Sequence, residues 1–206
     1  MIKLYGSPLS SAGRCYWMLE ELAVPYEVMP LNLREKEQKS EAFLKINPNG
    51  KIPAMIDGDF VLWESMAINS YLAKKFESPL APKNLQEESL IQQWSLWGLV
   101  DFQEPAVSWM IQEFFVPAEH RNQLVIENSK KALPRVLEVL NRGLEGKTFL
   151  VGDRFTVADV NLGTVTDILL GLKYDLSAYP HIQRWMTELH SRPAYKKVAQ
   201  MRQMPK

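Results

Sequence analysis

The chain has 206 residues, of which 46% are hydrophobic and 23% charged, close to globular averages, so a real core is expected. Lys and Arg together number 24, as do Asp and Glu, and this balance gives no overall field to attract nucleic acid or an anionic membrane. No apolar run approaches the roughly 20 residues that cross a bilayer. We therefore expect a cytoplasmic protein with neither nucleic acid nor a membrane as its partner.

Metal chemistry has no support in the composition. The single cysteine, Cys15, excludes an internal disulfide and a multi-cysteine zinc site. The three histidines, His120, His181 and His190, do not have metal-ligand spacing with one another. We therefore expect no bound metal and no Ser-His-Asp triad.

The first third of the chain alternates strand-like and helical patterns. In chain order the patterns predict strand, helix, strand, helix, strand, strand and helix at residues 2–5, 12–22, 26–31, 34–46, 52–56, 60–62 and 66–76. The two consecutive strands flank a turn and are typical of a hairpin. This order implies a small mixed sheet in which a parallel β-α-β unit precedes an antiparallel hairpin.

Residues 78–84, SPLAPKN, change the character of the chain, because two prolines in a short polar stretch suit a linker. Long helical patterns dominate beyond them. Within this part, Thr156 and Asp159 have the spacing of a helix capping box. We predict an α/β domain, a linker and an all-helical domain at residues 1–78, 79–86 and 87–206.

Two serines lie where the first strand meets the first helix, in the segment PLSSAGR that begins at Pro8. Serines in this position are ordinary helix N-caps. The same geometry supplies free N–H groups and the positive end of a helix dipole, which favour a bound anion. In that case the hydroxyl of Ser10 or Ser11 would donate a hydrogen bond to a bound thiolate, and would not itself be the nucleophile.

Residues 47–65, NPNGKIPAMIDGDFVLWES, contain a proline within a strand-like run. Proline in a central strand removes a ladder hydrogen bond, so Pro53 belongs at a sheet edge. If the Ile52–Pro53 bond were cis, the Ile52 backbone would face outward, ready to pair with an extended peptide-like ligand. Glu64 and Ser65 then open a helix, where they could cap it or hold a ligand that carries an ammonium group and a carboxylate.

Four segments of the chain resemble the soluble glutathione S-transferases: LYGSPLSSAGR, NPNGKIPAM, LWESMAI and FLVGDRFTVADV. Together they span most of the chain with the spacing of that family. The resemblance implies a thioredoxin-like N-terminal domain that binds glutathione and an all-α C-terminal domain that completes the electrophile pocket. It also implies a cis bond before Pro53, a structural capping box in FTVADV, and a homodimer.

The resemblance further implies which residues form the site. The pattern Pro-x-Ser-Ser-x-x-Arg resembles the serine-type classes (delta, theta or chi) and places the catalytic hydroxyl on Ser10, with Ser11 as the alternative. Ile52 would pair with the cysteinyl backbone of glutathione, while Glu64 and Ser65 hold its γ-glutamyl end. The residues expected at the glycyl end are Gln38, Lys39 and Lys51. The residues expected in the hydrophobic substrate pocket are Leu9, Trp109 and Phe114.

Some positions depart from the family's pattern. Met66 stands where many relatives have arginine, so the γ-glutamyl carboxylate loses one cationic partner. Gly50 stands where some serine-type relatives have a histidine that touches the glycyl end. We therefore expect weaker glutathione binding than in close relatives. Cys15 lies too late in the first helix for a cysteine-type active site, and we expect it to pack in the core.

The predicted function is a glutathione S-transferase, a detoxification enzyme that activates its co-substrate glutathione as a thiolate for conjugation to hydrophobic electrophiles. Reduction of hydroperoxides by the same thiolate would be a further activity. The alternative is a non-catalytic protein of this fold that binds apolar ligands or a protein partner. A glutathione-dependent isomerase of the zeta type matches poorly, because that class has a longer loop containing Ser-Ser-Cys. The Ser10–Ser11 pair favours the transferase.

Overall fold

The structure is a computed structural model that describes residues 1–203. Its contacts divide the chain into two compact units. Unit 1 consists of residues 1–81 and the C-terminal segment from Ser191, and unit 2 consists of residues 82–190. The C-terminal segment thus groups with the sheet, whereas the sequence analysis placed 87–206 in one helical domain.

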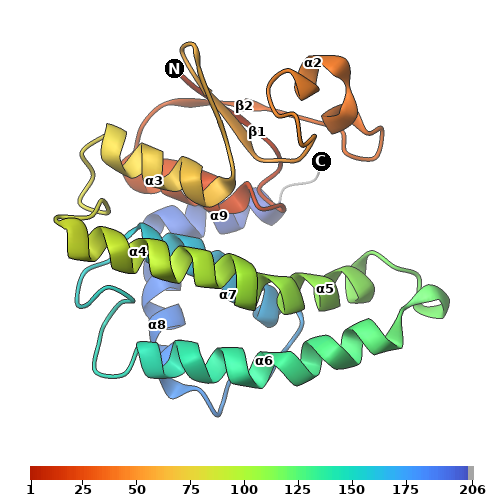
Figure 1. The fold of residues 1–206 in the computed structure, drawn as a ribbon, viewed down its shortest axis with the longest axis vertical. Helices are drawn as coiled ribbons and strands as arrows, with labels where there is room; N and C mark the ends of the chain where they lie inside the picture. The colour runs from red at the N-terminus through yellow and green to blue at the C-terminus, as the bar shows by residue number, and fades with distance from the viewer. Residues whose placement is uncertain (204–206) are drawn as a thin grey trace. The chain divides into compact units, whose positions relative to one another are not determined.

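Unit 1 is built on a four-stranded sheet in the order β2-β1-β3-β4 (Figure 1). Its strands are β1 (Ile2–Tyr5), β2 (Tyr26–Met29), β3 (Ala54–Asp57) and β4 (Phe60–Trp63). Strands β1 and β2 are parallel, whereas β3 pairs in antiparallel fashion with both β1 and β4. The predicted succession of a parallel β-α-β unit and an antiparallel hairpin is confirmed.

The helices of unit 1 are α1 (Gly13–Leu22), α2 (Glu41–Leu44), α3 (Ser65–Lys75) and α9 (Pro193–Gln203). Helix α1 contacts both α3 and α9. Residues 13–19 of α1 are all buried, so this helix forms the centre of the unit's core. Its position follows from the packing requirement of a small sheet, which must cover its apolar face with helices.

The predicted helix over residues 34–46 is wrong in extent. The structure has only a 3₁₀ turn at Glu37–Lys39 and the single turn of α2. The two are separated by Ser40, which has extended backbone angles and accepts a hydrogen bond from the Phe43 N–H at 3.2 Å. A serine N-cap in this conformation ends one helical segment and begins the next.

Helix α9 is held on α1 by ion pairs and an aromatic contact. Arg192 donates through Nε and Nη2 to the two carboxylate oxygens of Glu21, both at 2.7 Å. The rings of Trp17 and Tyr195 meet edge to face with centroids 5.0 Å apart. A bidentate pair of this kind fixes geometry as well as charge, which explains why the C-terminal segment belongs to unit 1.

The Ile52–Pro53 peptide bond is cis, as the family resemblance implied. Strand β3 lies between β1 and β4, so the expectation that Pro53 belongs at a sheet edge is wrong. The ladder of β3 begins at Ala54, one residue after the proline. A proline directly before the first ladder residue removes no ladder hydrogen bond, so a central strand tolerates it.

Unit 2 is helical, as predicted (Figure 1). A π-helical segment, Gly98–Phe102, joins the first two of its helices. Helix α5 packs on α6 and α4 packs on α7. Ten of the 15 residues of α7 are buried, so α7 is central to the unit. The five helices are α4 (Leu85–Trp97), α5 (Gln103–Phe114), α6 (Gln123–Gly143), α7 (Val157–Gly171) and α8 (Pro180–Ser191).

The predicted capping box is present at the start of α7. The Thr156 N–H donates to Asp159 Oδ2 at 2.8 Å. Asp159 Oδ1 also accepts from the Leu150 N–H and from the Trp185 indole N–H, both at 2.9 Å. Burial raises the pKa of Asp159, and these hydrogen bonds act in the opposite direction. The segment FTVADV is thus a structural element that ties α7 to the preceding loop and to α8.

Three further properties hold for the part of the chain that the structure describes. None of its helices combines the length and the hydropathy that a bilayer crossing requires. It contains no group of three or more His, Cys, Asp or Glu side chains that could hold a metal ion. Cys15 is a free, buried thiol.

Candidate glutathione site

The loop between β1 and α1 gives its two serines different environments. Ser10 Oγ donates to the Ser7 carbonyl at 2.7 Å and accepts from the Ala12 N–H at 3.1 Å. Ser11 is exposed, and its hydroxyl has no hydrogen-bond partner within residues 1–203. Helix α1 begins at Gly13 with Ala12 as its N-cap, so the ordinary N-cap interpretation of the serines is wrong.

The serine loop lies close to the residue that precedes the cis proline. A Cβ added at Gly6, which has a φ of +128°, would lie 2.9 Å from Ala12 Cβ and 3.2 Å from Ile52 Cβ. Only glycine permits both this backbone angle and this approach. The structure therefore brings Ile52, which lies just outside the β3 ladder, next to the loop that carries both serines.

A buried hydrogen bond joins the first turns of α1 and α3. Arg14 Nη1 donates to Ser65 Oγ at 3.2 Å, and these two residues are 3% and 5% exposed. Burial lowers the pKa of Arg14 to about 10, while Cys15 and Glu64 act to raise it. Arg14 therefore remains a cation at neutral pH beside the residues expected to hold the γ-glutamyl end.

In the sequence, Arg14 is the last position of the motif Pro-x-Ser-Ser-x-x-Arg, and its contact with Ser65 was not predicted. The available signal for such a contact was the charge of Arg14 itself, because a charged side chain is almost never fully buried unless it has a partner. Met66 is buried at 5% exposure and packs in the core. The cation beside Ser65 is thus Arg14 of α1, because the residue that follows Ser65 is the uncharged Met66.

Glu64 precedes α3 with an unusual backbone conformation. Its φ is 72° and its ψ is 110°, in a region that residues other than glycine rarely adopt. Glu64 occupies the N-cap position of α3 and its carbonyl accepts from the Ile68 N–H at 2.9 Å, but its side chain makes no capping hydrogen bond. The carboxylate is exposed at the start of the helix. Strained positions of this kind cluster at ligand sites.

Two of the residues expected to bind the glycyl end of glutathione, Gln38 and Lys39, lie beside Gly50. Lys39 Nζ donates to the Asn49 carbonyl at 3.0 Å. A Cβ added at Gly50, whose φ is +57°, would lie 2.8 Å from the Gln38 carbonyl oxygen and from Lys39 Nζ. Gln38 Oε1 is buried and has no hydrogen-bond partner in the described part of the chain. A buried acceptor without a partner suits a polar ligand.

Asn47 organises the loop that carries Lys51. Its Nδ2 donates to the Lys51 carbonyl at 2.6 Å, and its Oδ1 accepts from the Asn49 N–H at 3.0 Å. Asn47 is only 2% exposed, whereas Lys51 is exposed. Asn47 was not predicted from the sequence, although asparagine side chains readily replace backbone partners in turns.

The three residues expected in the hydrophobic pocket have unlike environments. Leu9, in unit 1, is 62% exposed, and Phe114, in unit 2, is 56% exposed, whereas Trp109 is 8% exposed. Trp109 Nε1 has no hydrogen-bond partner among residues 1–203. Lys130 Nζ lies 4.7 Å from the centroid of its ring, and Tyr174 meets it edge-on at 6.2 Å. Trp109 is therefore anchored inside unit 2, while Phe114 and Leu9 present apolar surface.

Comparison with known proteins points to one family. The family model described as "Glutathione S-transferase, N-terminal domain" matches residues 1–74, and that for the C-terminal domain matches residues 105–193. The probable glutathione S-transferase GSTF2 of Oryza sativa subsp. japonica is 36% identical over 213 residues, which cover 99% of this chain and 98% of the relative. These matches confirm the predicted thioredoxin-like and all-helical architecture.

Solved structures agree. Glutathione transferase F2 from Populus trichocarpa is 30% identical with a TM-score of 0.91, covering 98% of this chain and 99% of that one. A glutathione transferase from Burkholderia graminis, solved with two glutathione molecules per subunit, is 27% identical with a TM-score of 0.88, covering 100% and 88%. The two plant relatives carry the designation F, and not the delta, theta or chi class named from the sequence. The chain belongs to the glutathione S-transferase family, enzymes that transfer glutathione to electrophiles.

Proposed function

We propose that this protein is a serine-type glutathione S-transferase that binds glutathione on unit 1 and activates its thiol for conjugation to hydrophobic electrophiles. One observation carries the proposal: the serine loop, Ile52 and the pair Arg14–Ser65 belong to one compact unit, in which Gly6 lies close to both Ala12 and Ile52 and Arg14 donates to Ser65. An isolated thiol has a pKa near 8.5, so only a few per cent is thiolate at neutral pH. The site must therefore stabilise the anion.

The required stabilisation is within reach of a hydroxyl and a helix terminus. Lowering the thiol pKa by about two units takes roughly 2.7 kcal/mol. A hydrogen bond to a charged acceptor contributes about 1.5–3 kcal/mol. The positive end of α1 adds about 0.3–1 kcal/mol. Neither a metal nor a histidine is needed.

Ser10 is the proposed donor to the thiolate. Its Oγ is fixed by two hydrogen bonds within the loop, donating to the Ser7 carbonyl and accepting from the Ala12 N–H. Because a hydroxyl hydrogen rotates about the Cβ–Oγ bond, donation can pass from the Ser7 carbonyl to a sulfur atom while the Ala12 contact stays. Ser11, whose exposed hydroxyl has no partner among the described residues, is the alternative.

The rest of glutathione would lie along the neighbouring segments. The Ile52 backbone would pair with the cysteinyl residue, and Glu64 with Ser65 would hold the γ-glutamyl end. Arg14 keeps a positive charge at that end, where Met66 supplies none. The glycyl carboxylate would be held by Gln38, Lys39 and Lys51.

The hydrophobic electrophile would contact Leu9, Trp109 and Phe114. The exposure of Leu9 and Phe114 supports their contact with the electrophile, since both present large apolar side chains to solvent. The electrophile reacts at the glutathione sulfur, which forms the new bond while the electrophile's leaving group departs. A hydrophobic pocket lowers the cost of bringing an apolar electrophile out of water.

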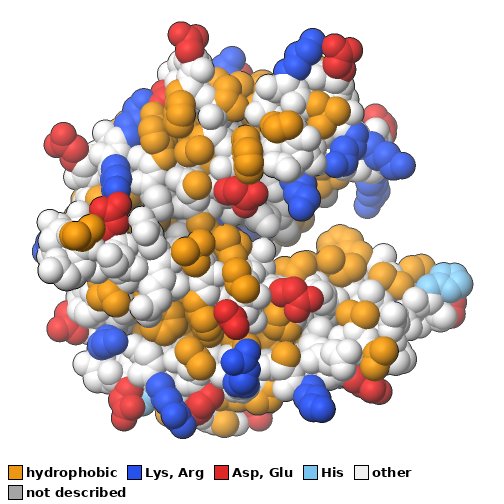
Figure 2. Space-filling view, in the orientation of Figure 1, with side chains coloured by type: hydrophobic (Ala, Val, Ile, Leu, Met, Phe, Trp, Pro, Cys, Tyr) orange, Lys and Arg blue, Asp and Glu red, His pale blue; other side chains and the backbone are white. Residues whose placement is uncertain are grey.

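A homodimer in the cytoplasm is the proposed working form. Phe60, Val61 and Trp63 of the edge strand β4 are 45%, 39% and 38% exposed. Figure 2 shows hydrophobic side chains on the surface of both units. Leu96 and Val100, around the end of α4, are 62% and 72% exposed. Such an edge is a surface that proteins cover. Light scattering after size-exclusion chromatography should give a molar mass of twice 23.7 kDa. The mass of a monomer would refute the dimer but not the transferase activity.

A steady-state assay with glutathione and an aryl halide tests the function. We expect saturable turnover that falls when Ser10 is replaced by alanine. A non-catalytic ligand-binding protein would bind glutathione, measured by calorimetry, yet show the same rate as the uncatalysed reaction. That pair of results would reject the transferase and support the alternative.

A further inference from the structure

Helix α9 runs antiparallel to α1, so that its last turn reaches the beginning of α1. Just before α9, Arg192 pairs with Glu21, which lies in the last turn of α1. Near the end of α9, Arg202 Nη2 lies 3.2 Å from the position of a Cβ added at Gly13, the first residue of α1. The pairing of the two helices therefore brings the Arg202 guanidinium to the loop that carries Ser10.

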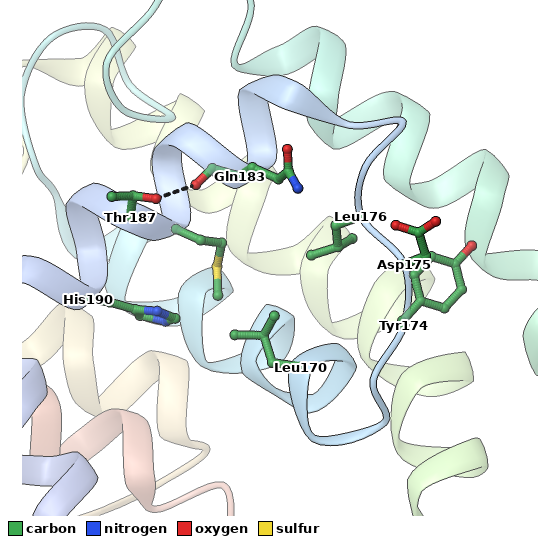
Figure 3. Close-up of a pocket in the computed structure, with 8 residues that line it drawn as sticks. Leu170, Tyr174, Asp175, Leu176, Gln183, Thr187 and His190 are labelled. Carbon is green, nitrogen blue, oxygen red and sulfur yellow. Dashed lines mark hydrogen bonds between the residues drawn. The ribbon is translucent and has the colours of Figure 1, made fainter.

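The side chain of Arg202 is held in this direction by an aromatic ring. Helix α9 follows α8, whose end is fixed within unit 2, where His190 Nε2 (Figure 3) lies 2.9 Å from Asp167 Oδ1. Within unit 1, Tyr195 meets the fully buried Trp17 ring edge to face at 5.0 Å. Arg202 Cζ lies 6.0 Å from the centroid of the Tyr195 ring, at the limit of a cation–π contact.

The serine loop closes at the point that Arg202 reaches. A Cβ added at Gly13 would lie 2.5 Å from the Pro8 carbonyl oxygen, so the two ends of the loop meet there. We call this point the Pro8–Gly13 junction. The Gly13 N–H donates to the Ser10 carbonyl at 2.8 Å, and the Pro8 carbonyl accepts no hydrogen bond within residues 1–203. A cation beside the junction can therefore attract the Pro8 carbonyl dipole.

The surroundings of the junction carry positive charge. Residues 6–13 contain no acidic side chain, and the N-terminus of α1 is the positive end of its dipole. Arg14 is a buried cation in the same turn, on which the Glu64 carboxylate acts. The two carboxylates of α1 lie at its other end, where they pair with Lys197 and Arg192. An anion bound at the serine loop would therefore be favoured over a neutral group.

We propose that Arg202 is a positioning residue of the glutathione site, an inference that rests on the proposed function. Its guanidinium attracts the Pro8 carbonyl and keeps the two ends of the serine loop together. Ser10, which lies between these ends, is thereby held where its hydroxyl can donate to the thiolate. Because Arg202 acts through this loop, its loss should affect activation of the thiol more than binding of glutathione, whose two ends are held by other segments.

Three variants separate this role from the docking of α9. Arg202→Met removes the guanidinium and keeps an apolar stem, whereas Arg202→Lys keeps a cation. Lys197→Met is the matched control, because Lys197 is a cation of α9 that pairs with Glu20, 2.6 Å away and remote from the junction. All three variants are compared with wild type in the full chain.

The thiolate absorbance of bound glutathione, titrated against pH, gives the first readout. Arg202→Met should raise the thiol pKa by about 0.3–0.7 units, the two- to fivefold effect expected of a part-exposed charge. Below that pKa, kcat should fall by about the same factor while the KM for glutathione stays unchanged. Arg202→Lys should return the thiol pKa to the wild-type value, and Lys197→Met should leave it there. An unchanged pKa in Arg202→Met, no recovery in Arg202→Lys, or an equal rise in Lys197→Met would overturn the proposal.

Hydrogen exchange without glutathione gives a second readout, which does not depend on activity. The amides of Ser10, Ala12 and Gly13 should exchange about two- to fivefold faster in Arg202→Met than in Lys197→Met, because the loop opens more often. Equal rates would overturn the role of Arg202. Failure of the proposed function has a different signature, since the thiol of glutathione bound to wild type would then keep a pKa near 8.5.

Discussion

Arg14 and Ser65 meet through a buried hydrogen bond of 3.2 Å that couples the first turns of α1 and α3. The loop just before α1 carries Ser10, and Glu64 just before α3 has a positive φ. This contact therefore helps to fix the relative positions of the segments proposed to hold the sulfur and the γ-glutamyl end of glutathione. A buried cation needs its hydrogen-bond partners, so the contact resists change.

Replacing Ser65 with alanine should weaken both the fold and glutathione binding. The buried guanidinium loses one acceptor, which should lower the free energy of unfolding by about 1–3 kcal/mol. The KM for glutathione should rise more than kcat falls, because the thiol-activating loop is untouched. Urea denaturation and steady-state kinetics measure the two effects. Ser70→Ala is the control, since that hydroxyl donates within α3 to the Met66 carbonyl; an unchanged KM in Ser65→Ala would refute the role.

Gly50→Ala should raise the KM for glutathione by displacing the residues around Gly50. The new Cβ would lie 2.8 Å from the Gln38 carbonyl oxygen and from Lys39 Nζ. Gly58→Ala is a matched control, because Gly58 has a φ of +60° but no atom within 4 Å of the added Cβ. Both variants should lose about 1 kcal/mol of stability from the left-handed backbone. A similar KM for glutathione in the two variants would count against a glycyl subsite here.

Much of the fold was predictable because its signals are local. The strand at 2–5 and the hairpin around Gly58 depend on alternation and a turn within a few residues. The 34–46 segment was mispredicted, because Lys36 adopts a left-handed conformation and Ser40 an extended one, which composition does not reveal. The grouping of α9 with unit 1 depends on an ion pair between residues 171 positions apart in the sequence.

The site was predictable as a set of segments, but the contacts between them were not. The resemblance pointed to Ser10, Ile52 and Ser65, and the structure places all three in unit 1. The donation of Ser10 to Ser7 and of Arg14 to Ser65 follows from tertiary packing. Neither contact leaves a pattern in composition or periodicity.

Cys15 should be unreactive in the native protein. Burial raises the pKa of its thiol from 9.0 to about 12, and Arg14 only partly opposes this. Iodoacetamide at pH 8 should therefore modify Cys15 in urea but not in buffer, and mass spectrometry reports this residue alone because the chain has one cysteine. Fast alkylation of the folded protein would contradict the burial.

The same shift makes stability depend on pH in the alkaline range. Because the folded pKa is raised, the unfolded chain releases the Cys15 proton first, so this contribution is complete below pH 9 and declines as pH rises toward 12. Wild type should lose about 1 kcal/mol more than Cys15→Ala between pH 9 and pH 10. Urea denaturation at the two pH values measures the difference, and parallel curves would exclude the effect.

Asp159→Asn should destabilise unit 2 without changing the chemistry at unit 1. The carboxylate accepts from the Leu150 and Thr156 N–H groups and from the Trp185 indole, and an amide nitrogen in place of one oxygen would face donors. The free energy of unfolding should fall by about 2 kcal/mol or more. At a temperature where the variant remains folded, its KM for glutathione should match wild type; a higher KM would show that Asp159 does more than hold the fold.

The most direct test of thiol activation by the serine loop is the ultraviolet thiolate absorbance of bound glutathione, titrated against pH in wild type, Ser10→Ala and Ser11→Ala. Wild type should show a thiol pKa about two units below the free value near 8.5. Ser10→Ala should raise that pKa by about one to two units, and Ser11→Ala should leave it in place. An unchanged pKa in Ser10→Ala would contradict the assignment, and an unchanged pKa in both variants would exclude the serine-type mechanism.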